Sequence, residues 1–174
     1  MLLVQSQAYG EQYGFNSIYL ILANLYGPRD TFDLNKSHVI PSMIHKMLEA
    51  KIEKKNVVTF WGTGKATRDF LFVRDAVDGI ALATEIYNKP MPINLASGNE
   101  LSIVKLAELI QKKVDFKGNI LWDSTKPDGQ LRRLFDISKA KKEFGFYPKI
   151  NFEDGLEETI NWYKINKFGA NFEN

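Results

Sequence analysis

The chain has 174 residues, 44% hydrophobic and 25% charged, a composition typical of a globular domain with a buried core. Its 23 Lys and Arg residues nearly balance its 21 Asp and Glu residues, so the net charge of +2 gives no argument for nucleic-acid binding. The absence of cysteine excludes disulfides and thiolate zinc sites, and we expect no metal. No apolar run reaches the ~18–20 residues of a membrane span and no signal-peptide pattern opens the chain, so we expect a cytoplasmic protein.

The first third of the chain predicts a helix, a buried strand and a second helix. Residues 1–13 favour a helix that ends before Gly14. Residues 17–23 form a nearly continuous apolar and β-branched run, which is typical of a parallel strand buried on both faces. Residues 37–51 place their apolar side chains on one stripe and predict a helix with Ser37 as its N-cap.

Short strands and helices alternate over the rest of the chain. Strands are predicted at residues 57–60, 69–73, 93–96, 119–122 and 131–135. Helices are predicted at residues 76–87, after Ser102, at residues 138–144 and after Asn151. Only residues 17–23 are of the long, buried, parallel type, whereas a free-standing doubly wound domain needs several such strands. The predicted fold class is therefore α/β, with the remnant of a Rossmann-type parallel sheet plus a smaller C-terminal α/β lobe.

We expect this organisation to divide the chain at residue 35. Residues 1–35 would hold the last helix and strand of the incomplete Rossmann domain, and residues 36–166 mainly the smaller lobe. Residues 167–174 would form a frayed tail. No internal repeat or low-complexity segment interrupts this order.

Gly62 and Gly64 flank a single residue in a motif that superficially resembles a cofactor loop. A dinucleotide-binding loop needs a third glycine three residues later at a strand-to-helix turn. Thr67 occupies that position, and a strand is predicted to follow it. The sequence therefore predicts a tight turn here rather than a cofactor loop.

Arg68 and Trp61, on either side of this turn, are candidates for ligand binding. A planar guanidinium grips a diphosphate through two parallel hydrogen bonds, and a flat indole can stack on a sugar or a base. Each residue also has a simpler interpretation, Arg68 as an exposed surface arginine and Trp61 as a half-buried loop tryptophan.

Three further residues and one turn are candidates with equally simple alternatives. His38 directly precedes a helix start, although an isolated histidine is more often structural. Lys46 lies two turns further on, where it can also belong to a solvated polar face. Asn24 follows the buried strand, where ligands approach the carboxyl edge of a parallel sheet, or it caps the next turn. Residues 126–129 form a β-turn pattern that Pro and Gly explain.

Four segments, taken together, carry a resemblance to a known family. They are Asn24-Leu25-Tyr26-Gly27-Pro28, Ser37-His38-Val39-Ile40-Pro41, Trp61-Gly62-Thr63-Gly64 with Arg68-Asp69-Phe70, and Lys126-Pro127-Asp128-Gly129. Their order and spacing resemble the C-terminal portion of GDP-L-fucose synthases, which are extended short-chain dehydrogenases/reductases. The resemblance runs from Met1 to about Lys164. These enzymes convert GDP-4-keto-6-deoxymannose to GDP-L-fucose with NADPH.

The resemblance implies a role for each candidate residue. His38 would be the catalytic acid of epimerisation and would lie at both the substrate and the cofactor site. The substrate-binding residues would be Lys46, Trp61, Arg68, Asp128 and Arg133, and the cofactor-binding residues Asn24, Leu25 and His38. The implied ligands are a GDP-sugar and NADPH, with no nucleic-acid or membrane partner. The full enzyme is expected to be a homodimer.

The resemblance also implies chemistry that these residues lack. The family's glycine-rich cofactor loop and its Tyr-x-x-x-Lys pair would precede residue 1, no such pair lies near Met1, and the cysteine base of epimerisation has no counterpart. We therefore expect a fragment or the product of a split gene, which binds substrate weakly and does not turn it over alone. Two alternatives stay open. One is the C-terminal part of another nucleotide-sugar epimerase or dehydratase, and the other is a non-catalytic module that keeps the family's oligomerising helix near Gly14.

Overall fold

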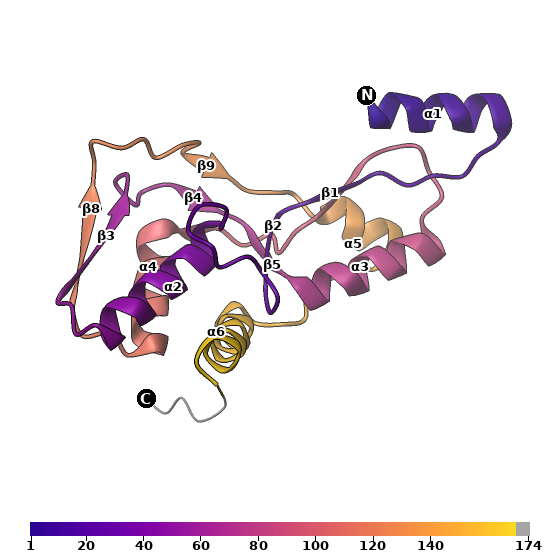
Figure 1. Cartoon of the computed structure of the whole chain (residues 1–174). Helices are drawn as coiled ribbons and strands as arrows, with labels where there is room; N and C mark the ends of the chain where they lie inside the picture. Colours follow the sequence, from indigo (N-terminus) through magenta and orange to yellow (C-terminus); the bar gives the residue numbers. More distant parts are fainter. Residues whose placement is uncertain (170–174) are drawn as a thin grey trace. The chain divides into compact units, whose positions relative to one another are not determined.

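The computed structural model describes residues 1–169 as alternating helices and short strands (Figure 1). The helices are α1 (Leu2–Tyr13), α2 (Val39–Ile52), α3 (Val73–Ile86), α4 (Ile103–Val114), α5 (Ser138–Phe144) and α6 (Phe152–Phe168). The strands are β1 (Leu20–Leu22), β2 (Asn24–Tyr26), β3 (Val57–Trp61), β4 (Thr67–Arg68), β5 (Phe70–Phe72), β6 (Ile93–Leu95), β7 (Leu101–Ser102), β8 (Asn119–Asp123) and β9 (Arg132–Arg133). Every predicted helix and strand has a counterpart, although β9 spans only two of the residues predicted for it.

The chain folds into two compact units, and each unit gathers three separate stretches of sequence. Unit 1 contains Met1–Leu25, Asp69–Asn99 and Leu134–Ile150, and unit 2 contains Tyr26–Arg68, Glu100–Arg133 and the described residues from Asn151 onward. The sequence instead predicts a single division at residue 35. The two descriptions differ because β6, far along the chain, pairs with β1 and so belongs with the N-terminal residues.

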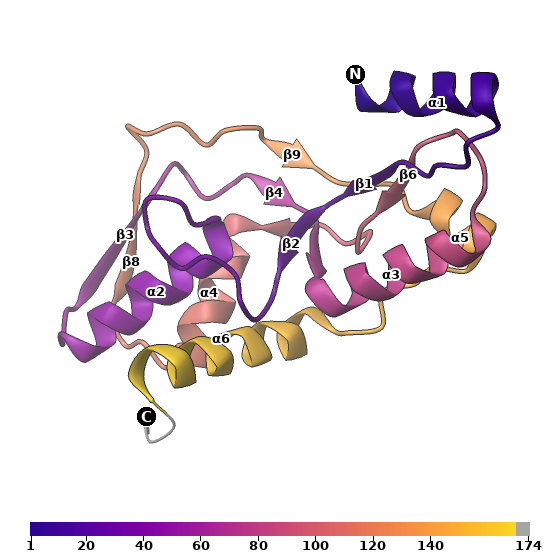
Figure 2. The same ribbon diagram turned by 45° about the vertical axis from the view of Figure 1, so that its right-hand side comes forward.

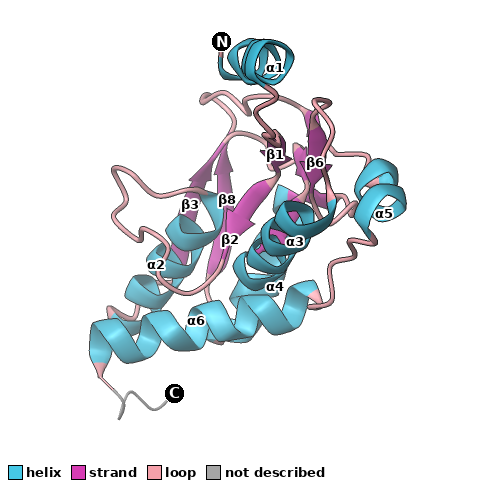
Figure 3. Ribbon diagram, turned by 90° about the vertical axis from the view of Figure 1, so that its right-hand side faces the viewer, coloured by secondary structure: helices cyan, strands magenta, loops and turns pink. Residues whose placement is uncertain are grey.

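Unit 1 is built on the parallel strands β1 and β6, in which Leu20 lies opposite Ile93 (Figure 3). Leu20 and Leu22 pack against a buried core to which α3, β6 and α5 contribute. Ile21 points to the opposite face of β1, where its side chain is 37% exposed. The strand predicted at residues 17–23 is therefore shorter than expected. In the described part of the chain it is covered on one face, and the prediction of two buried faces was wrong.

Helix α1 ends where the sequence predicts. Gly14 follows it with a φ of +63°, a left-handed conformation that glycine adopts without a steric penalty. No residue of α1 is buried. Its exposed apolar side chains include Leu2, Val4, Tyr9 and Tyr13. This helix of unit 1 therefore presents a substantial apolar surface.

Unit 2 combines two small sheets with three helices (Figure 2). Strands β3 and β8 run parallel, from Val57 opposite Asn119 to Trp61 opposite Asp123. Strand β4 lies at the centre of the second sheet, between β7 and β9. Helix α4 packs against both α2 and α6. The ends of β3 and β4 thus carry the Trp61–Arg68 segment on a framework held by both sheets.

Two predicted helix N-caps are confirmed. Ser102 Oγ accepts a hydrogen bond from the Lys105 N–H at 3.2 Å, at the start of α4. Asn151 Oδ1 accepts one from the Glu153 N–H at 2.8 Å, at the start of α6. Each bond satisfies a backbone donor that the helix itself leaves unpaired, so the chain enters both helices as predicted.

The predicted N-cap of α2 was wrong. His38, rather than Ser37, occupies the N-cap position, and the helix begins at Val39. Pro41 then lies in the first turn, where backbone N–H groups have no intrahelical partner and its missing N–H does no harm. The first turn of α2 thus tolerates Pro41. Neither Ser37 nor His38 makes a side-chain cap.

Helix α6 continues to Phe168, so Lys167 and Phe168 belong to the helix rather than to the tail predicted at residues 167–174. The last residues of that predicted tail, 170–174, lie outside the described residues. Across residues 1–169, no helix combines the length and the apolar character needed to cross a membrane.

Candidate functional site

The end of β3 brings aromatic and cationic side chains together on unit 2. Trp61, the last residue of β3, is 71% exposed. The ammonium group of Lys126 lies 6.0 Å from the centre of a Trp61 ring. The ammonium group of Lys46, on α2, lies 5.7 Å from the centre of the neighbouring Phe60 ring. Both distances allow an attraction between the cation and the ring, so two positive charges lie beside this strand.

Asp128 holds the turn at residues 62–64. Its Oδ1 accepts a hydrogen bond from the Thr63 N–H at 2.6 Å, and its Oδ2 accepts one from the Thr63 hydroxyl at 2.7 Å. Thr63, first through its hydroxyl and then through its N–H, lowers the pKa of Asp128. Gly62 has a φ of +82°, and a Cβ there would lie 2.3 Å from Asp128 Oδ1. The predicted tight turn is confirmed, and glycine is required for the carboxylate to approach it.

Strand β4 places Arg68 beside Arg133. The parallel pairing of β4 with β9 sets Thr67 opposite Arg132 and Arg68 opposite Arg133. Successive residues of a strand alternate between its faces, so the register puts the second pair on one face and the first pair on the other. The structure therefore brings two of the predicted substrate residues to neighbouring positions.

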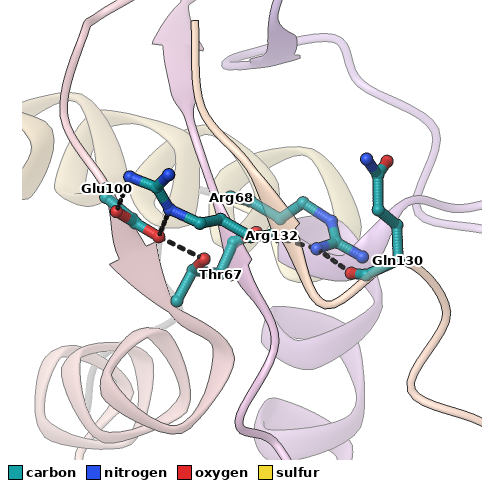
Figure 4. A network of polar contacts seen from close by, with 5 residues as sticks. All are labelled: Thr67, Arg68, Glu100, Gln130 and Arg132. Atoms are coloured by element: carbon teal, nitrogen blue, oxygen red, sulfur yellow. Dashed lines mark hydrogen bonds and ion pairs between the residues drawn. The ribbon is translucent and has the colours of Figure 1, made fainter.

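The Arg68 guanidinium is aimed by main-chain carbonyl groups (Figure 4). Its Nη1 donates to the Thr67 carbonyl at 2.7 Å and to the Gln130 carbonyl at 2.5 Å. In the described part of the chain, Arg68 has no carboxylate partner. Its charge is therefore uncompensated there, and the edge formed by Nε and Nη2 faces no protein acceptor within residues 1–169.

Glu100 neutralises Arg132, another arginine of this sheet. Arg132 Nε donates to Glu100 Oε1 at 2.8 Å and Arg132 Nη2 donates to Oε2 at 2.9 Å, while the Thr67 hydroxyl donates to Oε1 at 2.5 Å (Figure 4). Arg132 first, and Thr67 second, lower the pKa of Glu100 to about 2. Sequence reasoning missed Glu100. Its partner is 32 residues away, and only the strand order β7-β4-β9 brings the two together.

His38 lies in unit 2 with its side chain exposed at the N-cap position of α2. Among the described residues, its imidazole makes no hydrogen bond or ion pair. The preceding side chain, Ser37 Oγ, is buried and equally has no hydrogen-bond partner in that part of the chain. The exposed His38 imidazole is thus accessible to a ligand, whereas the Ser37 hydroxyl is enclosed by the protein.

The other predicted cofactor residues, Asn24 and Leu25, lie in unit 1 and contact the protein itself. The Asn24 amide donates to the Asp69 carbonyl at 3.3 Å. Leu25 packs against the core of unit 1. Asn24 therefore has a structural contact, but this contact is to the Asp69 backbone and not to the next turn, which the simpler interpretation expected it to cap.

Asp69 is a second residue that sequence reasoning did not single out. Its side chain is fully buried, and its Oδ1 accepts from the Ser97 N–H at 2.9 Å and from the Ser97 hydroxyl at 2.6 Å. Its Oδ2 accepts from the Gly98 N–H at 3.0 Å. A buried carboxylate is stable only with such donors, so Asp69 fixes the Ser97–Gly98 loop within unit 1.

A Tyr-x-x-x-Lys spacing does occur on α6, at Tyr163 and Lys167. The Tyr163 hydroxyl is hydrogen-bonded to His45 Nδ1 at 2.7 Å, and its ring stacks on Phe32 with the ring centres 3.9 Å apart. Burial raises the pKa of Tyr163, which is opposite to what a catalytic tyrosine acid requires. This pair therefore joins α6 to α2 as a packing contact.

The model of the NAD dependent epimerase/dehydratase family matches residues 1–96, and the chain belongs to this family. Among curated proteins, it is 43% identical over 164 residues to probable GDP-L-fucose synthase 1 of Oryza sativa subsp. japonica, covering 94% of this chain and 50% of that protein. It is 35% identical over 170 residues to the GDP-L-fucose synthase of Escherichia coli K12, covering 92% and 53%. The chain spans about half the length of the curated relatives it matches. The resemblance predicted from the four segments is confirmed.

Solved structures confirm the fold class. A GDP-L-fucose synthetase from Naegleria fowleri, bound to NADP, superposes with a TM-score of 0.87 at 29% identity, covering 95% of this chain and 54% of that chain. A GDP-6-OMe-4-keto-L-xylo-heptose reductase from Campylobacter jejuni gives a TM-score of 0.85 at 28% identity, covering 94% and 58%. Both similarities extend over nearly all of this chain.

Proposed function

We propose that this chain is the GDP-sugar-binding part of a GDP-L-fucose synthase, an enzyme that epimerises and reduces GDP-4-keto-6-deoxymannose with NADPH. The observation that carries the proposal is the uncompensated charge of Arg68, whose guanidinium is aimed by two carbonyl groups. A fixed guanidinium with an open edge is suited to bidentate contact with a diphosphate. The identity to curated GDP-L-fucose synthases supports the choice of sugar nucleotide.

The remaining substrate residues have complementary chemistry. Trp61 offers an exposed aromatic face for a sugar or a base. Lys46 and Arg133 add positive charge. Asp128 holds the turn after Trp61, and we expect it also to accept hydrogen bonds from the nucleotide part of the substrate. A lysine at position 46 gives charge without a bidentate fork, so we expect Arg68 to contribute more to affinity.

We propose that Asn24, Leu25 and His38 contribute to the binding of NADPH, which supplies the hydride for reduction when it is bound. The exposed imidazole of His38, which makes no hydrogen bond within residues 1–169, fits a polar ligand. His38 would also hold the proton that it delivers during epimerisation. His38→Asn should therefore slow the exchange of solvent deuterium at the carbons beside the substrate's ketone more than it slows reduction of that ketone.

A second observation favours an interaction role for α1. None of its residues is buried, and it exposes Leu2, Val4, Tyr9 and Tyr13. We propose that this surface forms the homodimer of the full enzyme. Sedimentation of the chain and of a Leu2→Glu/Tyr13→Glu variant tests this role, since a dimer that persists in the variant would contradict it.

Turnover tests the proposed function directly. NADPH oxidation with GDP-4-keto-6-deoxymannose should be undetectable for a polypeptide of these 174 residues, which contains no glycine-rich cofactor loop. It should appear when the N-terminal half of a GDP-L-fucose synthase is supplied in the same chain. A fusion that folds and does not bind the GDP-sugar would contradict the proposal, and turnover by the 174 residues alone would contradict the assignment of catalytic roles.

A further inference from the structure

We propose that Glu100 is a positioning residue for the diphosphate site: it holds β9 against β4, so that the Gln130 carbonyl keeps the Arg68 guanidinium aimed at the ligand. This inference rests on the proposed function of Arg68. Glu100 itself touches no ligand in this proposal. It acts through Arg132 and the backbone that precedes Arg132.

The Glu100 carboxylate connects neighbouring strands of the sheet. It directly precedes β7, its carboxylate receives two parallel hydrogen bonds from Arg132 of β9, and it accepts a third from Thr67 of β4. The carboxylate therefore binds side chains from both of the other strands of this sheet. A two-pronged arginine–carboxylate pair fixes both distance and direction, which a single contact would not do.

The segment that leads into β9 contains the Gln130 carbonyl, which orients the Arg68 guanidinium. Gln130 lies two residues before Arg132, and its carbonyl accepts from Arg68 Nη1 at 2.5 Å. Between them, the Leu131 carbonyl accepts from the Thr67 N–H at 2.8 Å. β9 is only two residues long, so few backbone hydrogen bonds hold this strand, and the Glu100–Arg132 pair adds a side-chain attachment.

Electrostatics alone makes the opposite prediction. Replacing Glu100 with a neutral residue removes a negative charge and frees the charge of Arg132, and both changes should strengthen the binding of an anion. If Glu100 acts by positioning, the same replacement should weaken binding, because Arg68 loses its fixed orientation. The sign of the change therefore separates the two explanations.

The test is a titration of the 174-residue chain with GDP. Calorimetry measures the Kd, and NMR records the signal of the Arg68 side-chain Nε–H. We expect Glu100→Gln to raise the Kd for GDP about five- to tenfold and to shift that signal in the free protein. The matched control is Glu108→Gln, which removes the same charge from an exposed ion pair with Lys105 on α4. It should leave the Kd unchanged or slightly lower it.

A second variant approaches the pair from the other side. Arg132→Lys keeps the charge but loses the two-pronged contact, so positioning predicts weaker GDP binding, whereas electrostatics predicts no change. Equal or tighter binding by Glu100→Gln, or an unmoved Arg68 signal, would overturn this inference and leave the proposed function standing. Absence of GDP binding by the unmutated chain would contradict the proposed function, and this inference with it.

Discussion

The two units use carboxylates in different ways. In unit 1, Asp69 and Asp75 are buried and accept hydrogen bonds mainly from backbone N–H groups of loops. In unit 2, Glu100 is exposed and Asp128 is half-buried. Glu100 accepts from the side chains of Arg132 and Thr67, and Asp128 accepts from the hydroxyl and the backbone N–H of Thr63.

The buried carboxylates of unit 1 therefore stabilise the fold, whereas the more exposed carboxylates of unit 2 support a proposed binding surface. A buried carboxylate has exchanged all its water for protein donors, so its removal strands those donors in the interior. An exposed carboxylate keeps water as a substitute partner, so its removal costs the fold little and mainly alters the orientation of neighbouring groups. We therefore expect substitution of the buried carboxylates of unit 1 to affect unfolding, and substitution of the more exposed carboxylates of unit 2 to affect binding.

The largest expected effect is on stability, from Asp69→Ala. The variant leaves the Ser97 and Gly98 N–H groups without their acceptor, which should lower the free energy of unfolding by about 3–5 kcal/mol. Urea denaturation measures the loss, with exposed Asp78→Ala as the control. A loss below ~1 kcal/mol would mean that water or another group replaces the carboxylate.

Next in size is the loss of GDP affinity in Arg68→Ala. A charged bidentate contact contributes about 1.5–3 kcal/mol, so the Kd should rise roughly tenfold or more. Urea denaturation should show little change, because the Arg68 hydrogen bonds go to carbonyl groups near the surface. Arg68→Lys should recover only part of the affinity. Lost stability with normal affinity would make Arg68 structural and break the contrast between the units.

A smaller loss is expected from Gly62→Ala, because the new Cβ would meet Asp128 Oδ1 at 2.3 Å. Backbone strain at residue 62 and displacement of the Asp128 carboxylate should together lower the free energy of unfolding by about 1–3 kcal/mol. Gly145→Ala is the matched control, since Gly145 also has a positive φ, of +69°, but nothing lies within 4 Å of its Cβ position. The excess loss in Gly62→Ala, and a changed Trp61 fluorescence, would measure the Asp128 contact. Equal losses would show that Asp128 moves aside freely.

The smallest expected effect is a pH dependence of unit 2. Burial first, and Lys167 second, lower the pKa of His45 from 6.5. The folded state then binds fewer protons than the unfolded state, so His45 should favour folding above the unfolded pKa and lose that contribution as the pH falls through its folded pKa. Urea denaturation between about pH 7 and pH 5 should show a steeper decline for the unmutated chain than for His45→Gln. Parallel declines would contradict this assignment.

The helices were predictable because their signals are local. The caps Ser102 and Asn151 and the stop at Gly14 lie within a few residues of the backbone groups they satisfy or the turn they form. The tight turn at residues 62–64 was predictable for the same reason. The start of α2 was not, because a serine and a proline compete within one turn and sequence alone gives no ranking of the two.

The supports of the site could not be predicted, because they depend on strand order. Arg68 and Trp61 were identified from their residue types and their resemblance to a family, whereas Glu100 and Asp69 act through partners 28 to 32 residues away. The composition of the two units from separate stretches of sequence was missed for a related reason, since the pairing of β1 with β6 crosses more than seventy residues of chain. Periodicity reports which face of an element is buried, but not which element covers it.

The central claim is that the Trp61–Arg68 segment binds the nucleotide diphosphate, and GDP titration of the isotope-labelled chain tests it most directly. We expect saturable shifts of the Trp61 indole N–H and the Arg68 Nε–H, with little change at Trp162, which lies on α6 and stacks against Phe32. GMP, which lacks the second phosphate, should bind more weakly. No saturable shift at Trp61 and Arg68, or equal binding of GDP and GMP, would contradict the account.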